Sequence, residues 1–137
     1  MNSFQLYLII SSLCICLIFA YGNYRCASKD TYFKDPLLTK LEFLDLDGWS
    51  LTHVLLYVLL GYLLPDHFVY IMLMGVLWEI VEHFVLNHLK SLNYHAKCTN
   101  MLLPRDQENR WWFGRVSDIP MNALGFAIGY HLSKRRI

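Results

Sequence analysis

Two carboxylates and an imidazole lie close together in an apolar stretch of the chain, at Glu79, Glu82 and His83. On a helix, their i, i+3 and i+4 spacing places all three on one face. Such a stripe can share a proton, bind a cation or hold a basic partner. A carboxylate inside a bilayer costs about 2.5–3.5 kcal/mol on insertion scales, so we expect this face to meet protein or water rather than lipid.

Two other apolar stretches carry polar residues at helical intervals. Asp118 and Asn122 are four residues apart, with Arg115 one turn earlier. His53 and Tyr57 show the same interval of four. Because unpaired burial of a charge is costly, we expect these groups to converge on one interior site. The predicted intramembrane polar cluster consists of His53, Glu79, Glu82, His83, Arg115, Asp118 and Asn122.

Each of these groups also has a purely structural interpretation. Asp118, or Ser117 before it, can cap the N-terminus of the last helix. The acids and the histidine within 79–83 can form a network that only joins helices, and His53 can be a packing residue. No serine or cysteine has an evident base beside it, so the sequence assigns no catalytic residue.

The spacing of Glu79, Glu82 and His83 argues against a metal site. Carboxylate-bridged helical bundles use Glu-x-x-His pairs from two helices, whereas here Glu79 precedes His83 by four residues and no second such motif occurs. The four cysteines form no CxxC pair, and the zinc-protease motif His-Glu-x-x-His is absent from the sequence. We therefore expect neither a metal nor a cofactor.

The elements that must position these residues are apolar segments of near-membrane length. Hydrophobic residues make up 55% of the 137 residues and aromatic residues 15%, more than is usual in a soluble domain. About 20 apolar residues cross the hydrocarbon core of a bilayer. The sequence predicts one all-α domain, residues 1–137, that forms a polytopic, multi-pass integral membrane four-helix bundle with spans at about 4–21, 50–64, 67–86 and 117–132.

The segments between the spans complete the expected topology. Asp35-Pro36 followed by spaced leucines predicts a short amphipathic helix at the membrane interface, and Pro65-Asp66 predicts the turn of a hairpin. The N-terminus has no Lys or Arg before the first span, which favours a retained anchor over a cleaved signal peptide. Four crossings put both termini on one side, and the basic residues of the two long loops place those loops in the cytosol.

Small residues continue the polar stripe of the last span. Gly125 and Gly129 form a GxxxG pattern, which lets two helix backbones approach closely. They follow Asp118 and Asn122 at helical intervals. We therefore expect the polar face and the packing face of this span to coincide.

Three segments together resemble the VanZ-like family of small integral membrane proteins. The similarity rests on GWSLTHVLLYVLLG at 48–61, on GVLWEIVE at 75–82, and above all on the segment 115–129, which reads Arg-x-x-Asp-x-x-x-Asn-x-x-Gly-x-x-x-Gly. The resemblance covers about residues 47–132. It implies a four-helix membrane bundle and an envelope-linked role such as glycopeptide tolerance.

Two classes of function follow. In the first, the buried polar site binds the head group of a lipid or another amphiphile. In the second, the chain is a non-enzymatic structural component of a cell envelope or of the inner membrane of a large virus, and its polar residues only join helices within an assembly of protein partners. A pocket beside the acids favours the first class, and a closed network favours the second. The net charge of +1 predicts no nucleic-acid partner.

Overall fold

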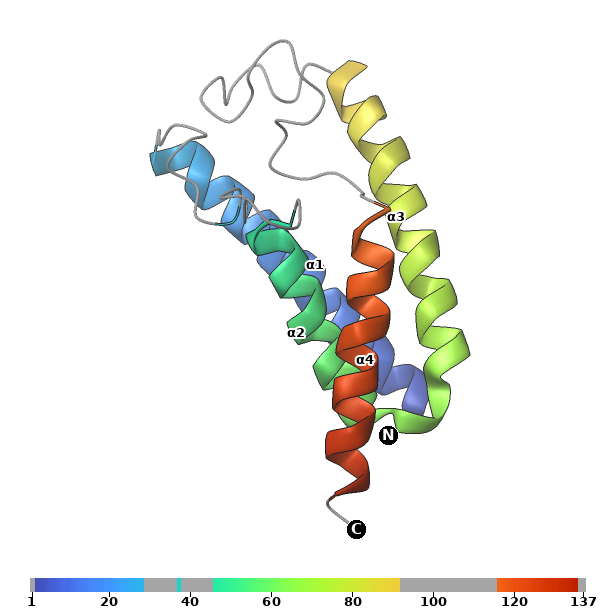
Figure 1. The fold of residues 1–137 in the computed structure, drawn as a ribbon. Coiled ribbons are helices and arrows are strands. Elements are labelled where there is room, and N and C mark those ends of the chain that lie inside the picture. Colours follow the sequence, from blue (N-terminus) through green and yellow to red (C-terminus); the bar gives the residue numbers. More distant parts are fainter. Residues whose placement is uncertain (1, 29–36, 38–45, 92–115, 136–137) are drawn as a thin grey trace.

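The computed structural model describes residues 2–28, 37, 46–91 and 116–135 of the chain (Figure 1). Within these ranges the chain is helical and contains no β-strand. The predicted all-α fold with four main helices is therefore confirmed. The helices are α1 (Ser3–Ser28), α2 (Gly48–Leu63), α3 (Phe68–Ser91) and α4 (Asp118–Lys134), with a short 3₁₀ helix, η3, at Pro65–His67.

Local chemistry sets both ends of α2. Asp47 is its N-cap, and the Asp47 Oδ1 accepts the backbone N–H of Ser50 at 3.0 Å, which satisfies an amide that has no partner within the helix. The helix ends at Leu63, two residues before Pro65, because a proline ring clashes with the preceding helical turn. η3 then turns the chain back, so the hairpin predicted at residues 65–66 joins α2 to α3 (Figure 1).

Glycines bring the backbones of α2 and α4 into direct contact. A Cβ atom at any of three glycine positions would overlap a backbone carbonyl of the facing helix, so a larger residue would force the helices apart. The two helices consequently lie side by side over much of their length (Figure 1). The three contacts pair Gly61 with Phe126, Gly125 with Val54 and Gly129 with Val58.

α3 packs against α4 and the η3 turn. The rings of Phe68 and Phe126 meet edge to face, with their centroids 5.2 Å apart. Gly75 of α3 leaves room for the hydroxyl of the buried Tyr57 on α2. Ile71 is fully buried. The core therefore lies where α2, α3 and α4 meet, and Tyr7 and Ile10 of α1 extend it.

α1 crosses behind the other helices at an angle (Figure 1). Its Tyr7 ring meets Tyr70 of α3 at a centroid distance of 5.5 Å, and its Tyr21 ring meets Trp49 of α2 at 5.7 Å. Between these two aromatic contacts, α1 buries few side chains, and Leu17 is 67% exposed. α1 is therefore anchored at two places rather than packed along its whole length.

Large apolar side chains cover the outer faces of the helices. On α2 they recur every four residues, at Leu51, Leu55 and Leu59, which are 59%, 61% and 44% exposed. Two segments are long and apolar enough to cross a membrane: Ser3–Tyr21, with a mean hydropathy of 2.1, and Pro65–Phe84, with 1.3. α2 is apolar but shorter, at 16 residues. Two of the four helices thus have the length and composition of a membrane span.

Several helices extend beyond the predicted spans. α1 continues past residue 21 to Ser28, and α3 continues past residue 86 to Ser91. α2 begins two residues earlier than predicted because Asp47 caps it. The amphipathic helix predicted after Pro36 falls largely on 38–45, outside the described residues.

Replacing Gly129 by Leu should lower the thermal stability of the detergent-purified protein, because the new side chain must displace Val58 of α2. Overpacking of this kind costs about 1–3 kcal/mol. Ala127→Leu is the matched control, since Ala127 lies on the exposed side of the same helix. Thermal unfolding followed by circular dichroism compares both variants with the parent. Equal melting of the two variants would contradict the α2–α4 packing.

Candidate functional site

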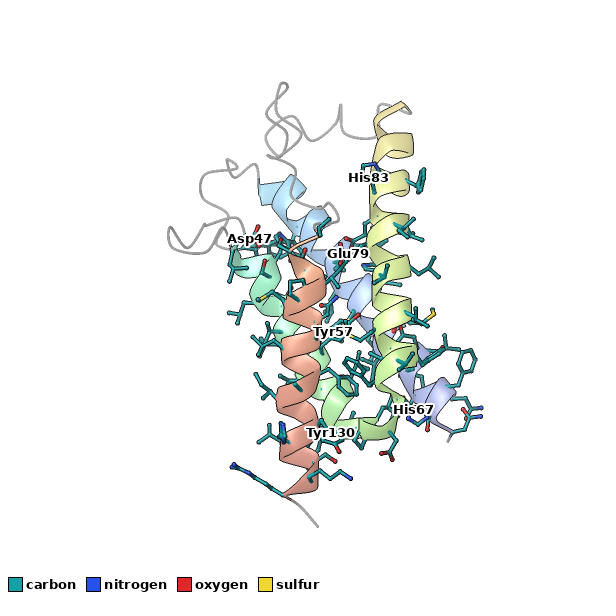
Figure 2. All side chains as sticks on the ribbon, turned by 45° about the vertical axis from the view of Figure 1, so that its right-hand side comes forward. Asp47, Tyr57, His67, Glu79, His83 and Tyr130 are labelled. Atoms are coloured by element: carbon teal, nitrogen blue, oxygen red, sulfur yellow. The ribbon has the colours of Figure 1, made fainter. Side chains whose placement is uncertain are left out.

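Buried polar side chains gather where the first turns of α2 and α4 lie beside the middle of α3 (Figure 2). Each of the six is at most 8% exposed, although the outer faces of the same helices are apolar. We call these six residues, together with the partly buried His53, the polar cluster. The six are Asp47, Ser50, Glu79, Glu82, Asp118 and Asn122.

Ser50 joins the first turns of α2 and α4. Its Oγ lies 3.1 Å from Asp118 Oδ1 and 3.4 Å from Asp47 Oδ1. A hydroxyl has one hydrogen to donate, and the closer carboxylate, that of Asp118, has the better geometry. Ser117 is the N-cap of α4 but makes no side-chain capping bond. The Asp118 carboxylate therefore connects two helices rather than only capping its own.

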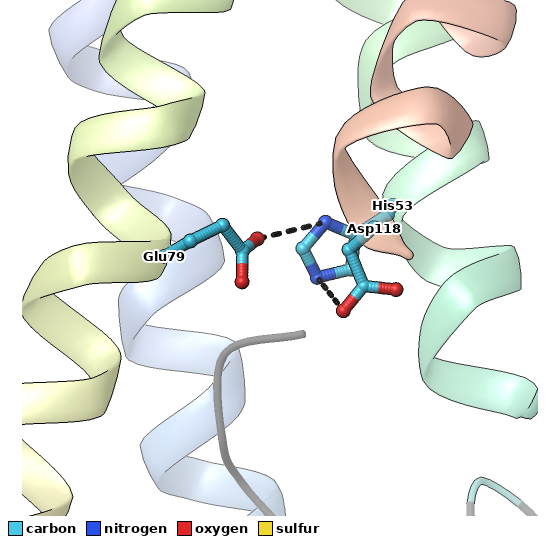
Figure 3. A group of neighbouring side chains, drawn as sticks. All are labelled: His53, Glu79 and Asp118. Carbon is cyan, nitrogen blue, oxygen red and sulfur yellow. Dashed lines mark ion pairs between the residues drawn. The ribbon is translucent and has the colours of Figure 1, made fainter. Parts of the chain in front are cut away.

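His53 stands between two carboxylates (Figure 3). Its Nδ1 lies 3.0 Å from Asn122 Oδ1, and because an amide oxygen only accepts, Nδ1 is the donor. Glu79 Oε1 is 3.8 Å from the same nitrogen, and Asp118 Oδ2 is 3.9 Å from Nε2. The bond to Asn122 thus orients the ring, while both carboxylates lie beyond direct hydrogen-bonding distance.

These side chains also have the donor set of a metal site. One ring nitrogen of His53 and one oxygen each from Glu79 and Asp118 lie within 4.8 Å of one another. The three residues come from α2, α3 and α4, so the site exists only when these helices pack together.

A pocket of about 680 Å³ lies between α1 and the polar cluster. Along α1 it extends from Tyr7 to Tyr21, which at 1.5 Å per residue is about 21 Å. Most of its lining is apolar, contributed by leucines, isoleucines and aromatic residues of α1, α2 and α3. Its polar wall is made of Asp47, His53, Glu82, Asp118 and Asn122.

The structure brings together five of the seven residues predicted for the polar site. His53, Glu79, Asp118 and Asn122 lie around one point, and the buried Glu82 lines the adjoining pocket. Gly125 and Gly129 continue this face of α4 and contact α2.

His83 does not join the others. Its side chain is exposed, and its ring meets Phe84 at a centroid distance of 6.0 Å. Successive helical residues are about 100° apart around the axis. Since Glu82 faces the interior, His83, the next residue, points about 100° away from it and is exposed. Arg115 lies outside the described residues.

Two contributions to the site were not predicted from the sequence. Ser50 is 1% exposed and links two carboxylates, and its place three residues after Asp47 is the spacing of an N-cap bond, a signal that could have identified it. Ser11 and Ser12 of α1 line the pocket, but nothing in their spacing distinguishes them from other serines of an apolar span.

Comparisons of the chain with protein-family models, with curated proteins and with solved structures find no match. The site is therefore interpreted from its own geometry. The resemblance to VanZ-like proteins stays a prediction from three sequence segments.

A double-mutant cycle tests the contact that orients His53. His53→Ala and Asn122→Ala should each destabilise the protein, and the double variant should lose less than the sum of the two because the side chains share one hydrogen bond. We expect a coupling free energy of about 0.5–1.5 kcal/mol, measured by chemical unfolding in detergent. The pair His131→Ala and Asn122→Ala is the control, since His131 is exposed near the far end of α4. Additive losses at His53 and Asn122 would show that the two side chains do not interact.

Proposed function

We propose that this chain is a multi-pass membrane protein that binds a lipid-like amphiphile, with the head group at the polar cluster and the apolar chain in the pocket beside α1. The observation that carries the proposal is the pocket itself, which has the ionisable and amide side chains of the polar cluster on one wall and is mostly apolar over the rest of its lining. A closed polar network that only joined helices would leave no such space.

The exposed apolar surface supports a place in the bilayer. Leucines repeat along the outer face of α2, and the outer face of α3 has Val69, Leu73 and Phe84 at 68%, 64% and 67% exposure. Continuous apolar surface of this extent is rare on soluble monomers. A four-helix membrane bundle places it against acyl chains and directs the acids inward, where their burial is compensated by partners.

The level of the polar cluster along the helices suits a head group. Asp47 and Asp118 lie at the start of α2 and α4, and His53 is one to two turns further along. In a membrane bundle this level is close to one interface rather than at the centre of the bilayer. The pocket then extends about 21 Å along α1, more than half of the hydrocarbon core of about 30 Å. A single acyl chain fits such a path.

The VanZ-like resemblance agrees with this proposal at the level of residues. The segments that carry it hold His53, Glu79, Glu82, Asp118 and Asn122, all of which belong to the polar cluster. The helix-packing glycines of the same motif, Gly125 and Gly129, set the distance between α2 and α4. The segment 115–129 thus supplies two residues of the polar wall, Asp118 and Asn122, together with the glycines that pack α4 against α2.

Filling the pocket should displace the amphiphile. Ser12→Trp places an indole in the pocket, and a steric penalty of about 1–3 kcal/mol weakens binding by roughly 5- to 150-fold. The measurement is the amount of lipid per chain that remains after detergent purification, determined by mass spectrometry. Leu13→Trp is the matched control, because Leu13 is 60% exposed and does not line the pocket.

The expected result is loss of bound lipid in Ser12→Trp, with the parent level kept in Leu13→Trp. Both variants must melt close to the parent temperature, so that unfolding does not mimic loss of binding. Equal lipid in all three proteins, or none in the parent, would contradict the proposal. That outcome would instead favour a structural membrane component.

A further inference from the structure

We propose that His53, Glu79 and Asp118 form a binding site for one divalent metal ion, for which zinc is the best match. The inference goes beyond amphiphile binding and needs only the packing of α2, α3 and α4. An imidazole nitrogen with two carboxylate oxygens is a ligand set that zinc accepts, and manganese is the nearest competitor for the oxygen ligands.

The distances fit an ion between the side chains better than direct contacts. His53 Nε2, the ring nitrogen that does not donate to Asn122, lies 3.9 Å from Asp118 Oδ2, beyond the range of a hydrogen bond, and Glu79 Oε1 lies 3.8 Å from the other ring nitrogen, Nδ1. Two ligand atoms on one tetrahedral zinc ion lie about 3.3–3.6 Å apart. The full set, one atom per residue, lies within 4.8 Å. Rotation of the long Glu79 side chain can close the remaining gap of about 1 Å.

The groups around the three ligands have the arrangement that metal sites require. A ligating histidine usually donates its other ring N–H to an oxygen, and here His53 Nδ1 donates to Asn122 Oδ1. This leaves Nε2 with its lone pair toward Asp118. The Asp118 Oδ1 accepts from the Ser50 hydroxyl, which orients the carboxylate with its Oδ2 3.9 Å from His53 Nε2. Two separate hydrogen bonds thus fix the orientation of two ligands.

The number of ligands and their surroundings indicate an open site. Structural zinc sites are closed by four protein ligands, whereas three ligands leave a position for water or a bound molecule. Glu79 and Asp118 are 8% and 3% exposed, while His53 and Asp118 also line the pocket. The open position would therefore be reached from the pocket.

This inference departs from the expectation of no metal drawn from the sequence. That expectation considered a motif within residues 79–83 of one helix. The ligands instead come one each from three helices, and His83 is not among them. No spacing along the sequence reports such an arrangement.

The test uses the full chain, purified in detergent, stripped with a chelator and titrated with zinc chloride alone. We expect one zinc ion per chain by elemental analysis and saturable binding by calorimetry. Cobalt in place of zinc should give the visible absorption of a four-coordinate ion. His53→Ala should abolish zinc binding and the cobalt absorption. His131→Ala, at an exposed position on α4, should retain both.

Two further variants keep the test decisive if His53→Ala fails to fold. Glu79→Gln preserves the shape of the ligand but removes its charge, and it should weaken zinc binding at least tenfold. Ser50→Ala removes the hydrogen bond that orients Asp118 and should weaken binding by roughly 10- to 100-fold. No bound zinc, or binding that is the same in folded Glu79→Gln and in the parent, would overturn the proposal.

Zinc is titrated without added amphiphile, and lipid retention is measured separately on metal-free protein. Each of the two proposals can therefore fail without the other.

Discussion

The close contact between the backbones of α2 and α4 determines where the polar cluster forms. Three glycine–carbonyl contacts fix the register of the two helices. In that register the Ser50 hydroxyl meets Asp118 at 3.1 Å and the His53 ring meets Asn122 at 3.0 Å. A rotation of α4 by one residue would turn its polar face by about 100° and separate both pairs. The site is therefore a consequence of helix packing rather than of any one helix.

The level of the cluster along the helices has an electrostatic reason. Asp47 and Asp118 lie at the N-termini of α2 and α4, where unpaired amides and the helix dipole stabilise negative charge. Asp47 accepts an N–H of its own helix, whereas Asp118 reaches across to Ser50. Placing the acids at helix starts lowers the cost of burying them. Further along the same helices the outward positions are apolar, as at Leu55, which is 61% exposed. This distribution suits helices that face acyl chains on the outside and hold their polar groups on the inside.

The sequence predicted the four helices because each contains a long apolar segment, and Pro65 marked the end of α2. The ends of α1 and α3 were not predicted, because both helices continue beyond their apolar segments into polar residues. The sequence also predicted that His53, Glu79, Asp118 and Asn122 would lie close together, since helical spacing assigns each to one stripe. The prediction was wrong for His83. Residues at i, i+3 and i+4 cover a wider arc of the helix than the part that packing buries, so His83 is left exposed. The pocket beside α1 and the three-helix ligand set depend on distances between helices, which no spacing within one segment reports. Ser50 is different, because its N-cap spacing from Asp47 is present in the sequence.

The proposed membrane bundle requires the helices to present an apolar face to lipid and to enclose a polar interior. The most direct measurement is an oxygen-accessibility scan by electron paramagnetic resonance, with single spin labels along α2 in a cysteine-free chain inserted in phospholipid vesicles. We predict high oxygen accessibility at Leu51, Leu55 and Leu59, and low accessibility at the buried Ser50, Tyr57 and Leu60. High accessibility of Leu55 and Leu59 to a water-soluble nickel complex would contradict the account.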